Sequence, residues 1–262
     1  MIIYGRNPVL EALRGRRATD VRDVWATPGA AREPWLEDVP VRTVAAEEIE
    51  RRCGSAAHQG LCAEAGVYRY AGADELLSGE NPLIVALDQV QDPQNLGSIC
   101  RTAECAGAAG VVIPERRAAE VTPAVCKASA GAVEHLRMAK VRNMADFLAD
   151  ARRAGFWCYG ASAPLAFRGI VSGEGSAATK AAAVRAPASA ERTPVPYDSP
   201  DYRDAGVVLV LGGEGSGLRP RVAKACDELI ALPLLGRMES LGVSAAAAAV
   251  LYEILQNRKA KP

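Results

Sequence analysis

The sequence lacks a run of apolar residues long enough to cross a membrane. Its first residues, MIIYGRNPVLEALRG, turn polar at Arg6, without the long apolar region or cleavage site of a secretory signal. It also lacks an excess of either charge, because 31 basic residues balance 31 acidic ones. Any surface that binds a polyanion must therefore be local. We expect a cytoplasmic protein that has no membrane partner.

Histidine is scarce and the cysteines are scattered. The chain has only His58 and His135, and its seven cysteines include no C-x-x-C pair. The usual zinc-ligand spacings are therefore missing, and a catalytic thiol would have few histidines to activate it. We expect no metal cofactor, and we expect most of the cysteines to be small buried apolar residues.

The 262 residues, 49% of them hydrophobic, can form one large domain or two modest ones. Helical patterns at 8–14 and 45–53 alternate with strand patterns at 21–26 and 60–67. We therefore expect a small α/β module over residues 1–72. The segment 73–82 is polar and contains the Gly, Asn and Pro typical of a linker.

From residue 83 to 262, short apolar strands alternate with helices, which predicts an α/β domain with a mainly parallel sheet. The expected strands are 83–87, 110–113, 136–141, 156–161, 207–211 and 228–232. Residues 171–205, rich in Ala, Ser, Gly, Thr and Pro, are expected to form a flexible surface insertion. The amphipathic pattern at 240–258 predicts a helix whose apolar stripe packs on its own sheet or on a second subunit.

The first segment whose polar residues could take part in a reaction is LDQVQDPQNLGSICRTAECAGAAGVVI. In it, a buried strand leads into Asp88, Asp92, Asn95 and Arg101. Gly97 would allow a neighbouring chain to approach closely. A purely local interpretation makes Asp92 a helix cap and Arg101 its ion-pair partner.

The second and third segments follow later strands. VVLVLGGEGSGLRP places four glycines within six positions around Glu214, an arrangement that resembles a dinucleotide-binding loop. A nicotinamide-dependent dehydrogenase is therefore an alternative, but its loop would normally lie near the start of its domain, and Glu214 would repel a pyrophosphate. LIALPLLGRMESLGVSAAAAAVLYEIL offers Ser240 or Ser244 as a helix cap.

Taken in order, the three segments resemble the three motifs of the SpoU/TrmH family of RNA ribose 2'-O-methyltransferases. The resemblance spans the C-terminal two-thirds of the chain. It implies a trefoil-knotted α/β domain of the SPOUT class, S-adenosylmethionine as the cofactor, and a homodimer formed through the last helix. A knot breaks the usual rules of chain topology, so periodicity cannot predict it.

The resemblance also implies roles for individual residues. The catalytic positions of the family correspond here to Asn95, Arg101, Glu214 and Ser240. The cofactor-binding positions correspond to Leu211, Gly212, Glu214, Leu232, Leu234 and Leu241. The family normally has an asparagine two residues after Ser240, and this chain has Gly242. The change removes an amide side chain that offers several hydrogen bonds.

The stretches IIYGRNPVLEAL and AAHQGLCAE resemble the small L30e-type RNA-binding module that precedes the catalytic domain in some members. This implies RNA contacts by Arg6, His58 and Gln59, together with Arg101 of the catalytic domain. His58 and Gln59 are equally explained as a turn before a strand. Two arginine clusters are candidates for phosphate contact, although such charges are more often simply solvated: Arg14, Arg16 and Arg17, and Arg116 and Arg117.

The module favours a guanosine of 23S rRNA as the methylated nucleotide, with RNA as the main partner. Three alternatives remain open within the resemblance: a tRNA methyltransferase, an rRNA methyltransferase that confers antibiotic resistance, and a non-catalytic RNA-binding factor for ribosome assembly.

Overall fold

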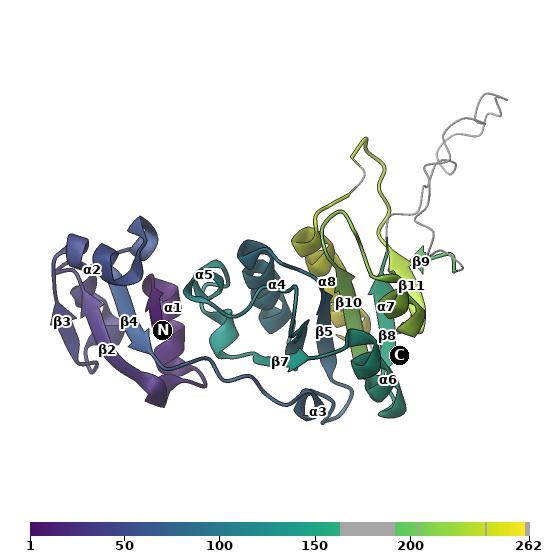
Figure 1. Ribbon diagram of the computed structural model, residues 1–262, viewed down its shortest axis with the longest axis horizontal. Helices are drawn as coiled ribbons and strands as arrows, with labels where there is room; N and C mark the ends of the chain where they lie inside the picture. The colour runs from purple at the N-terminus through teal and green to yellow at the C-terminus, as the bar shows by residue number, and fades with distance from the viewer. Residues whose placement is uncertain (163–191, 204, 239, 260–262) are drawn as a thin grey trace.

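The computed structural model describes residues 1–162, 192–203, 205–238 and 240–259. Two α/β units lie side by side (Figure 1). The N-terminal module contains a four-stranded sheet in the order β1-β4-β2-β3, in which β2 and β3 are parallel and the other pairs are antiparallel. Its main elements are β1 (Ile2–Tyr4), α1 (Arg6–Arg14), β2 (Val21–Ala26), β3 (Val41–Thr43), α2 (Ala46–Cys53) and β4 (Leu61–Ala65).

The longer elements of this module match the expected ones, since β2 spans the predicted strand and α1, α2 and β4 overlap the predicted helices and strand. The strands β1 and β3 were not expected, because three residues are too few to show an alternation. Ile3 of β1 is nevertheless fully buried, and it packs in one cluster with Val9 of α1 and Leu61 of β4. The apolar interior of this module is continuous with that of the second unit, because residues of both units belong to this cluster.

The second unit is a seven-stranded parallel sheet in the order β7-β6-β5-β10-β8-β11-β9. Its strands are β5 (Leu83–Asp88), β6 (Gly110–Pro114), β7 (Arg137–Val141), β8 (Trp157–Ala161), β9 (Val195–Pro196), β10 (Val207–Gly212) and β11 (Glu228–Ala231). All six predicted strands are present, each within one residue at either end.

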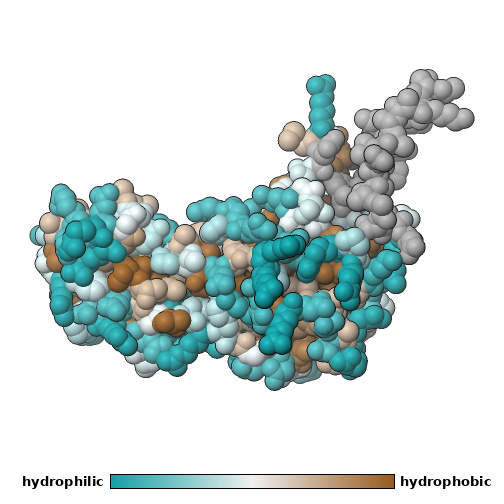
Figure 2. All heavy atoms as spheres, in the orientation of Figure 1, coloured by the Kyte–Doolittle hydropathy of each residue, from teal (hydrophilic) through white to brown (hydrophobic). Residues whose placement is uncertain are grey.

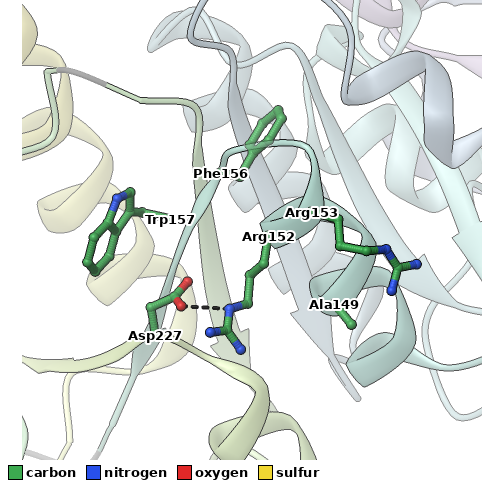
Figure 3. A pocket seen from close by; sticks show the side chains of 6 residues that line it. All are labelled: Ala149, Arg152, Arg153, Phe156, Trp157 and Asp227. Carbon is green, nitrogen blue, oxygen red and sulfur yellow. Dashed lines mark ion pairs between the residues drawn. The ribbon is translucent and has the colours of Figure 1, made fainter.

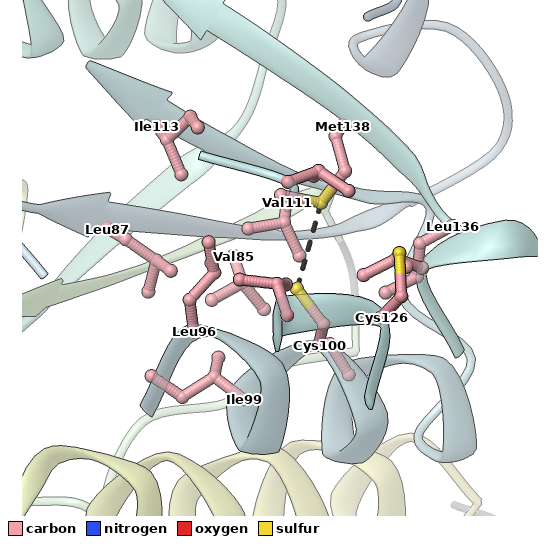
Figure 4. Close-up of a cluster of buried hydrophobic side chains, with 14 of the residues drawn as sticks. Val85, Leu87, Leu96, Ile99, Cys100, Val111, Ile113, Cys126, Leu136 and Met138 are labelled. Carbon is pink, nitrogen blue, oxygen red and sulfur yellow. Dashed lines mark hydrogen bonds between the residues drawn. The ribbon is translucent and has the colours of Figure 1, made fainter. Parts of the chain in front are cut away.

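Helices cover both faces of this sheet. They are α4 (Pro93–Cys105), α5 (Pro123–Ala128), α6 (Met144–Arg153), α7 (Pro220–Ala225) and α8 (Val243–Lys259). Side chains of α4 and α8 pack with one face of β5 and β10, whereas side chains of α6 and α7 pack with the opposite face. Figure 4 shows Leu96, Ile99 and Cys100 of α4 beneath Val85 and Leu87 of β5, with α8 below α4.

The close approach expected at Gly97 is present between α4 and α5. A Cβ atom at Gly97 would lie 2.4 Å from Cβ of Ala128 and 2.8 Å from the backbone nitrogen of Ser129. Carbon atoms in contact normally stay about 3.5–4.0 Å apart, so any side chain here would push the two helices apart. The last helix, α8, contacts α4 and β10. Of the two packing partners expected from the sequence, its own sheet or a second subunit, these contacts are with its own sheet.

The segment expected to be a linker is packed rather than free. It contains α3 (Ala73–Leu76), whose Leu76 is fully buried in the second apolar cluster of the catalytic sheet. Just before it, the Ala71 backbone N–H donates to the Met138 carbonyl at 2.8 Å, beside the edge strand β7. Most side chains of the segment are polar because they lie on its exposed side. The single buried residue Leu76 anchors it to the sheet.

The insertion expected at 171–205 is ordered at its end, so this expectation is wrong for residues 192–203. There, β9 pairs with β11 and extends the sheet. Tyr202 is 1% exposed, and its ring packs edge-on against Tyr159 with the ring centroids 4.9 Å apart. Residues 171–191 and 204 lie outside the described residues.

A buried ion pair joins the two units. The Arg17 Nε atom donates to Glu134 Oε2 at 2.8 Å, and both side chains are almost fully buried. The Tyr68 hydroxyl donates to the Val133 carbonyl at 2.9 Å beside this pair. Hydrophilic residues cover most of the face shown in Figure 2, where hydrophobic ones form scattered patches. Of the helices that the structure describes, none combines the length and apolarity needed to cross a bilayer.

Candidate functional site

The chain leaves β5 and β10 toward opposite faces of the sheet. These two strands are neighbours, and Asp88 at the end of β5 pairs in register with Gly212 at the end of β10. After β5 the chain continues into α4 on one face, and after β10 it continues into α7 on the other. In parallel α/β sheets, such a divergence opens a crevice at the carboxyl ends of the strands, where ligands bind. The first two chemical segments meet at this crevice.

The first segment builds the start of α4. Asp92 caps the helix, because its Oδ1 accepts from the Gln94 N–H at 3.1 Å, and Pro93 occupies the first turn. The local interpretation of Asp92 is therefore confirmed. The ion pair that the same interpretation expected between Asp92 and Arg101 is absent, because Arg101 is exposed and makes no ion pair with any described carboxylate. Arg101 lies about 9 Å along the helix axis from Asn95.

The second segment folds back on itself and reaches the first. Asn95 Nδ2 donates to Glu214 Oε1 at 2.7 Å, although 119 residues separate them in the sequence. A Cβ atom at Gly212 would lie 2.2 Å from the Gly217 carbonyl carbon, so only glycine allows the loop to return this closely. The Gly217 N–H donates to the Gly213 carbonyl at 3.0 Å and closes the loop.

A second link between these segments was not predicted. The fully buried carboxylate of Asp88 accepts from Arg219 Nε at 2.8 Å, and Arg219 follows the glycine-rich loop directly. The sequence analysis included Asp88 among the polar groups after β5 but did not single out Arg219. The only available signal was an arginine at the end of a motif, which does not reveal a partner 131 residues away.

The third segment connects β11 to α8. Leu232 and Leu234 are half-buried, whereas Ser240 is exposed and Leu241 is 50% exposed. Because α8 packs on α4, this loop returns to the side of the sheet that carries Asn95 and Arg101. The structure thus brings Asn95 and Glu214 into contact and places Arg101 on the same helix as Asn95. It records no contact between Ser240 and these three described side chains.

The residues expected to touch RNA in the N-terminal module differ in exposure. His58 is 8% exposed, and its Nδ1 accepts from the Gly60 N–H at 2.9 Å. The turn interpretation therefore explains His58, and direct RNA contact does not fit its burial. Gln59 is exposed, and its Oε1 accepts from Lys127 Nζ at 2.9 Å across the junction of the two units. Arg6, also exposed, pairs with Glu33 at 2.7 Å.

Burial explains most of the cysteines. It raises the pKa of the Cys100 and Cys126 thiols to about 12, so both are protonated at neutral pH and neither is a nucleophile. Cys105 is exposed, at the end of α4. Within the described residues, no group of three or more His, Cys, Asp or Glu side chains is arranged to hold a metal ion.

A hollow of about 480 Å³ lies elsewhere, at the amino end of the sheet. It is lined by Ala149, Arg152, Arg153, Phe156, Trp157 and Asp227. Figure 3 shows Arg152 paired with Asp227, their side chains 2.7 Å apart, and Trp157 on the far side of Asp227. Because β8 begins at Trp157, the hollow is at the end of the strands opposite to the crevice. None of the three chemical segments lines it.

The fold is that of an α/β protein whose polar motifs meet at the carboxyl ends of β5 and β10, the place where parallel sheets usually bind ligands. Comparison with protein families gives two matches. The SpoU rRNA Methylase family model matches residues 82–252, and the model described as RNA 2'-O ribose methyltransferase substrate binding matches residues 2–71. The chain therefore belongs to the SpoU/TrmH family of RNA methyltransferases, as its three segments suggested.

Individual relatives agree with this placement. The chain is 32% identical to YacO of Bacillus subtilis, assigned to the TrmH family of tRNA/rRNA methyltransferases, over 98% of this chain and 95% of that protein. It has the same identity to a tRNA/rRNA methyltransferase of Synechocystis that is named as uncharacterized, of whose length it spans 62%.

Solved structures share the fold. The SpoU methyltransferase AviRb of Streptomyces viridochromogenes, in complex with AdoMet, superposes with a TM-score of 0.73 at 22% identity, over 100% of this chain and 91% of that one. An AdoMet-bound rRNA methyltransferase of Sinorhizobium meliloti gives a TM-score of 0.69 at 25% identity, over 97% and 86% of the two chains. The expected fold class, a parallel α/β methyltransferase domain after a small α/β module, is confirmed.

Proposed function

We propose that this protein transfers a methyl group from S-adenosylmethionine to a ribose 2'-hydroxyl of RNA, with a guanosine of 23S rRNA as its target. The observation that carries the proposal is the hydrogen bond from Asn95 to Glu214. It joins two polar motifs at the carboxyl ends of neighbouring strands, where a parallel sheet binds its ligand. The S. meliloti relative, an rRNA methyltransferase, was solved with AdoMet bound.

The cofactor would be held mainly by backbone groups. The tight return of the chain over Gly212 leaves backbone N–H and C=O groups of the loop uncovered by side chains, which suits a ligand that is bound close to the main chain. The half-buried Leu232 and Leu234, with Leu211 and Leu241, would supply apolar contacts. When bound, the cofactor supplies the methyl carbon to which the ribose oxygen bonds as the carbon–sulfur bond breaks.

The polar residues of the site would orient the nucleotide and stabilise charge. Asn95 would orient the ribose, and Glu214 and Ser240 would hold the loops and Arg101 in place. A guanidinium is seldom neutral at pH 7, so Arg101 would clamp the nucleotide phosphate and stabilise the developing alkoxide rather than act as a base. The hydroxyl proton would pass to phosphate or water. Positioning of this kind contributes up to about 7–11 kcal/mol in favourable cases.

The rest of the assembly follows from the same proposal. The last helix, α8, exposes Tyr252 to 44%, and the loop before it exposes Leu241 to 50%. A second copy of the chain would cover these side chains in a homodimer, and the trefoil knot would form where the third segment passes the second. The exposed Arg6 and Gln59 of the N-terminal module would contact RNA in the cytoplasm.

The first test replaces Arg101. We expect Arg101→Ala to bind S-adenosylmethionine as the unaltered protein does but to lose methyl transfer to rRNA by at least about 100-fold, because charge stabilisation at the reacting oxygen is lost. Calorimetry and incorporation of labelled methyl groups measure the two properties. Arg153→Ala, an exposed arginine of α6 near the opposite end of the sheet, is the control. Retained turnover in Arg101→Ala would refute the proposed role.

One observation favours a second function, a non-catalytic RNA-binding assembly factor. Gly242 stands where the family normally has an asparagine, so one polar side chain of the site is missing. Mapping of ribose methylation by mass spectrometry in rRNA and tRNA, from cells with and without the gene, separates the functions. If cells without the gene lack a ribose methyl group in 23S rRNA, the main proposal is supported. If they lack one in tRNA, the substrate is tRNA instead. If they lack none, the assembly factor is favoured.

A further inference from the structure

The bases of the two catalytic loops are joined by one ion pair, in which the carboxylate is fully buried and the guanidinium is partly exposed. Asp88, the last residue of β5, is 0% exposed. Its carboxylate accepts two hydrogen bonds from Arg219, from the backbone N–H at 3.0 Å and from Nε at 2.8 Å, and it also forms an ion pair with Nη2 at 2.6 Å. Arg219 is 43% exposed and lies between the glycine-rich loop and α7. Among the described residues, it is the cation that pairs with Asp88.

The glycine-rich loop at 213–218 is therefore anchored at both ends of its excursion. At its base, the chain leaves the sheet at Gly212, beside Asp88, and returns to Asp88 at Arg219. At its tip, Glu214 accepts from Asn95 of α4. Between the two anchors the loop presses on the first segment, because a Cβ atom at Gly213 would lie 2.7 Å from the Gln89 carbonyl oxygen.

A carboxylate in this position is costly unless it is paired. Transfer of an ionised carboxylate from water to a protein interior carries a penalty of several kcal/mol, which only close and well-directed donors offset. An apolar residue would fill this buried position at a lower cost, so packing alone does not explain Asp88. The pair fixes the backbone at one defined position instead, and a loop fixed in its binding shape loses less conformational entropy when a ligand arrives.

We propose that Asp88 is a positioning residue which, through Arg219, holds the backbone of residues 211–218 in the shape that accepts S-adenosylmethionine. The inference rests on the proposed function, in which this backbone holds the cofactor. Neither Asp88 nor Arg219 touches the reacting atoms. Their effect is on cofactor affinity, transmitted through the loop that they secure.

The test is a double-mutant cycle in the full-length protein with Asp88→Asn, Arg219→Gln and the double variant. Each single variant is expected to raise the dissociation constant of S-adenosylmethionine, measured by calorimetry, by about tenfold, as a coupling of about 1–2 kcal/mol implies. The double variant is expected to bind about as weakly as the weaker single one. At saturating cofactor, kcat is expected to stay within about twofold, because the RNA-facing groups are intact.

Arg219→Lys keeps the charge without the guanidinium fork, so it is expected to recover part of the affinity lost in Arg219→Gln. This variant is also the milder change, because the Arg219 side chain is partly exposed. Hydrogen exchange of the amides at 213–218 gives a readout without cofactor, and it is expected to be faster in Asp88→Asn than in the unaltered protein.

The matched control is Glu134→Gln, which breaks the buried arginine–carboxylate pair that the described residues form at the junction of the two units. It is expected to lower the melting temperature while cofactor affinity and exchange in the loop stay unchanged.

Should Asp88→Asn and Arg219→Gln lower the melting temperature in the same way but bind the cofactor normally, the pair is only structural and the inference is wrong. The inference would also be wrong if the fold-increases in the dissociation constant of the two single variants multiplied in the double variant. An unaltered protein without affinity for S-adenosylmethionine would overturn the proposed function as well.

Discussion

Gly242 has a backbone conformation that explains which residues the position accepts. Its φ is +75°, in the left-handed region, and its carbonyl accepts from the Ala246 N–H at 3.1 Å at the start of α8. Asparagine is among the few residues with a side chain that adopt this region readily. A Cβ atom at Gly242 would meet nothing within 4 Å. The chain therefore has a backbone path at this position that would also suit an asparagine, without the amide.

Restoring the amide tests whether its absence limits catalysis. Gly242→Asn is expected to leave the melting temperature nearly unchanged, because asparagine, unlike most residues with a side chain, adopts the left-handed region readily. Methyl transfer to rRNA, measured with labelled cofactor, is expected to become faster. Gly242→Ala, which has a higher backbone cost of about 1–2 kcal/mol and no amide, is expected to melt lower and gain no rate. Equal rates for Gly242→Asn and the unaltered protein would show that the amide has no catalytic role here.

At the scale of helices and strands, apolar periodicity predicted the long elements and missed the short ones. Residues 83–87 and 207–211 are continuous apolar runs, as expected for strands buried on both faces. In contrast, β9 has two residues and lies in a segment of low complexity. Its existence depends on pairing with β11, and such tertiary contacts leave no local pattern.

The candidate site was predicted in its residues but not in its geometry. Asn95 and Glu214 were identified because their motifs resemble a family, yet nothing local to either residue indicates the other. Their contact requires β5 and β10 to be neighbours, although β6, β7, β8 and β9 lie between them in the chain. Arg219 escaped notice for the same reason.

The junction of the two units depends on the buried pair of Arg17 and Glu134. Glu134→Gln is expected to lower the free energy of unfolding by about 3–5 kcal/mol, because it leaves the Arg17 guanidinium buried without a counter-charge. Urea unfolding followed by circular dichroism measures the change.

The control for this prediction is Glu48→Gln, which removes an exposed carboxylate of α2 that pairs with Arg51 and Arg52. Surface pairs contribute little, so its urea midpoint is expected to match that of the unaltered protein. Equal midpoints for Glu134→Gln and Glu48→Gln would mean that the buried pair does not secure the junction.

At the scale of the whole molecule, a net charge of zero is combined with local concentrations of positive charge. Arg116 and Arg117 are exposed and follow β6 at the carboxyl end of the sheet, the same end as the crevice. Arg101 is also exposed, on α4. RNA would therefore be attracted to one edge of the catalytic domain rather than to the whole surface.

RNA affinity is expected to fall steeply with salt despite the neutral total charge, because each phosphate contact releases bound counterions. Replacing Arg116 and Arg117 together by alanine is expected to reduce the slope of log affinity against log salt by about 1.5, as two lost contacts imply. Filter binding between 50 and 200 mM salt measures the slope. The same change at Arg152 and Arg153, at the opposite end of the sheet, is expected to leave it unaltered. If both pairs reduced the slope equally, RNA would not be confined to one edge.

The central place of β10 has a consequence for how the protein is made. Val207 leaves the ribosome long after Leu83, so β5 must wait for its neighbour. During that interval the free edge of β5 is open to pairing with other chains. A message broken between codons 88 and 207 would therefore yield a polypeptide that is both inactive and prone to aggregate.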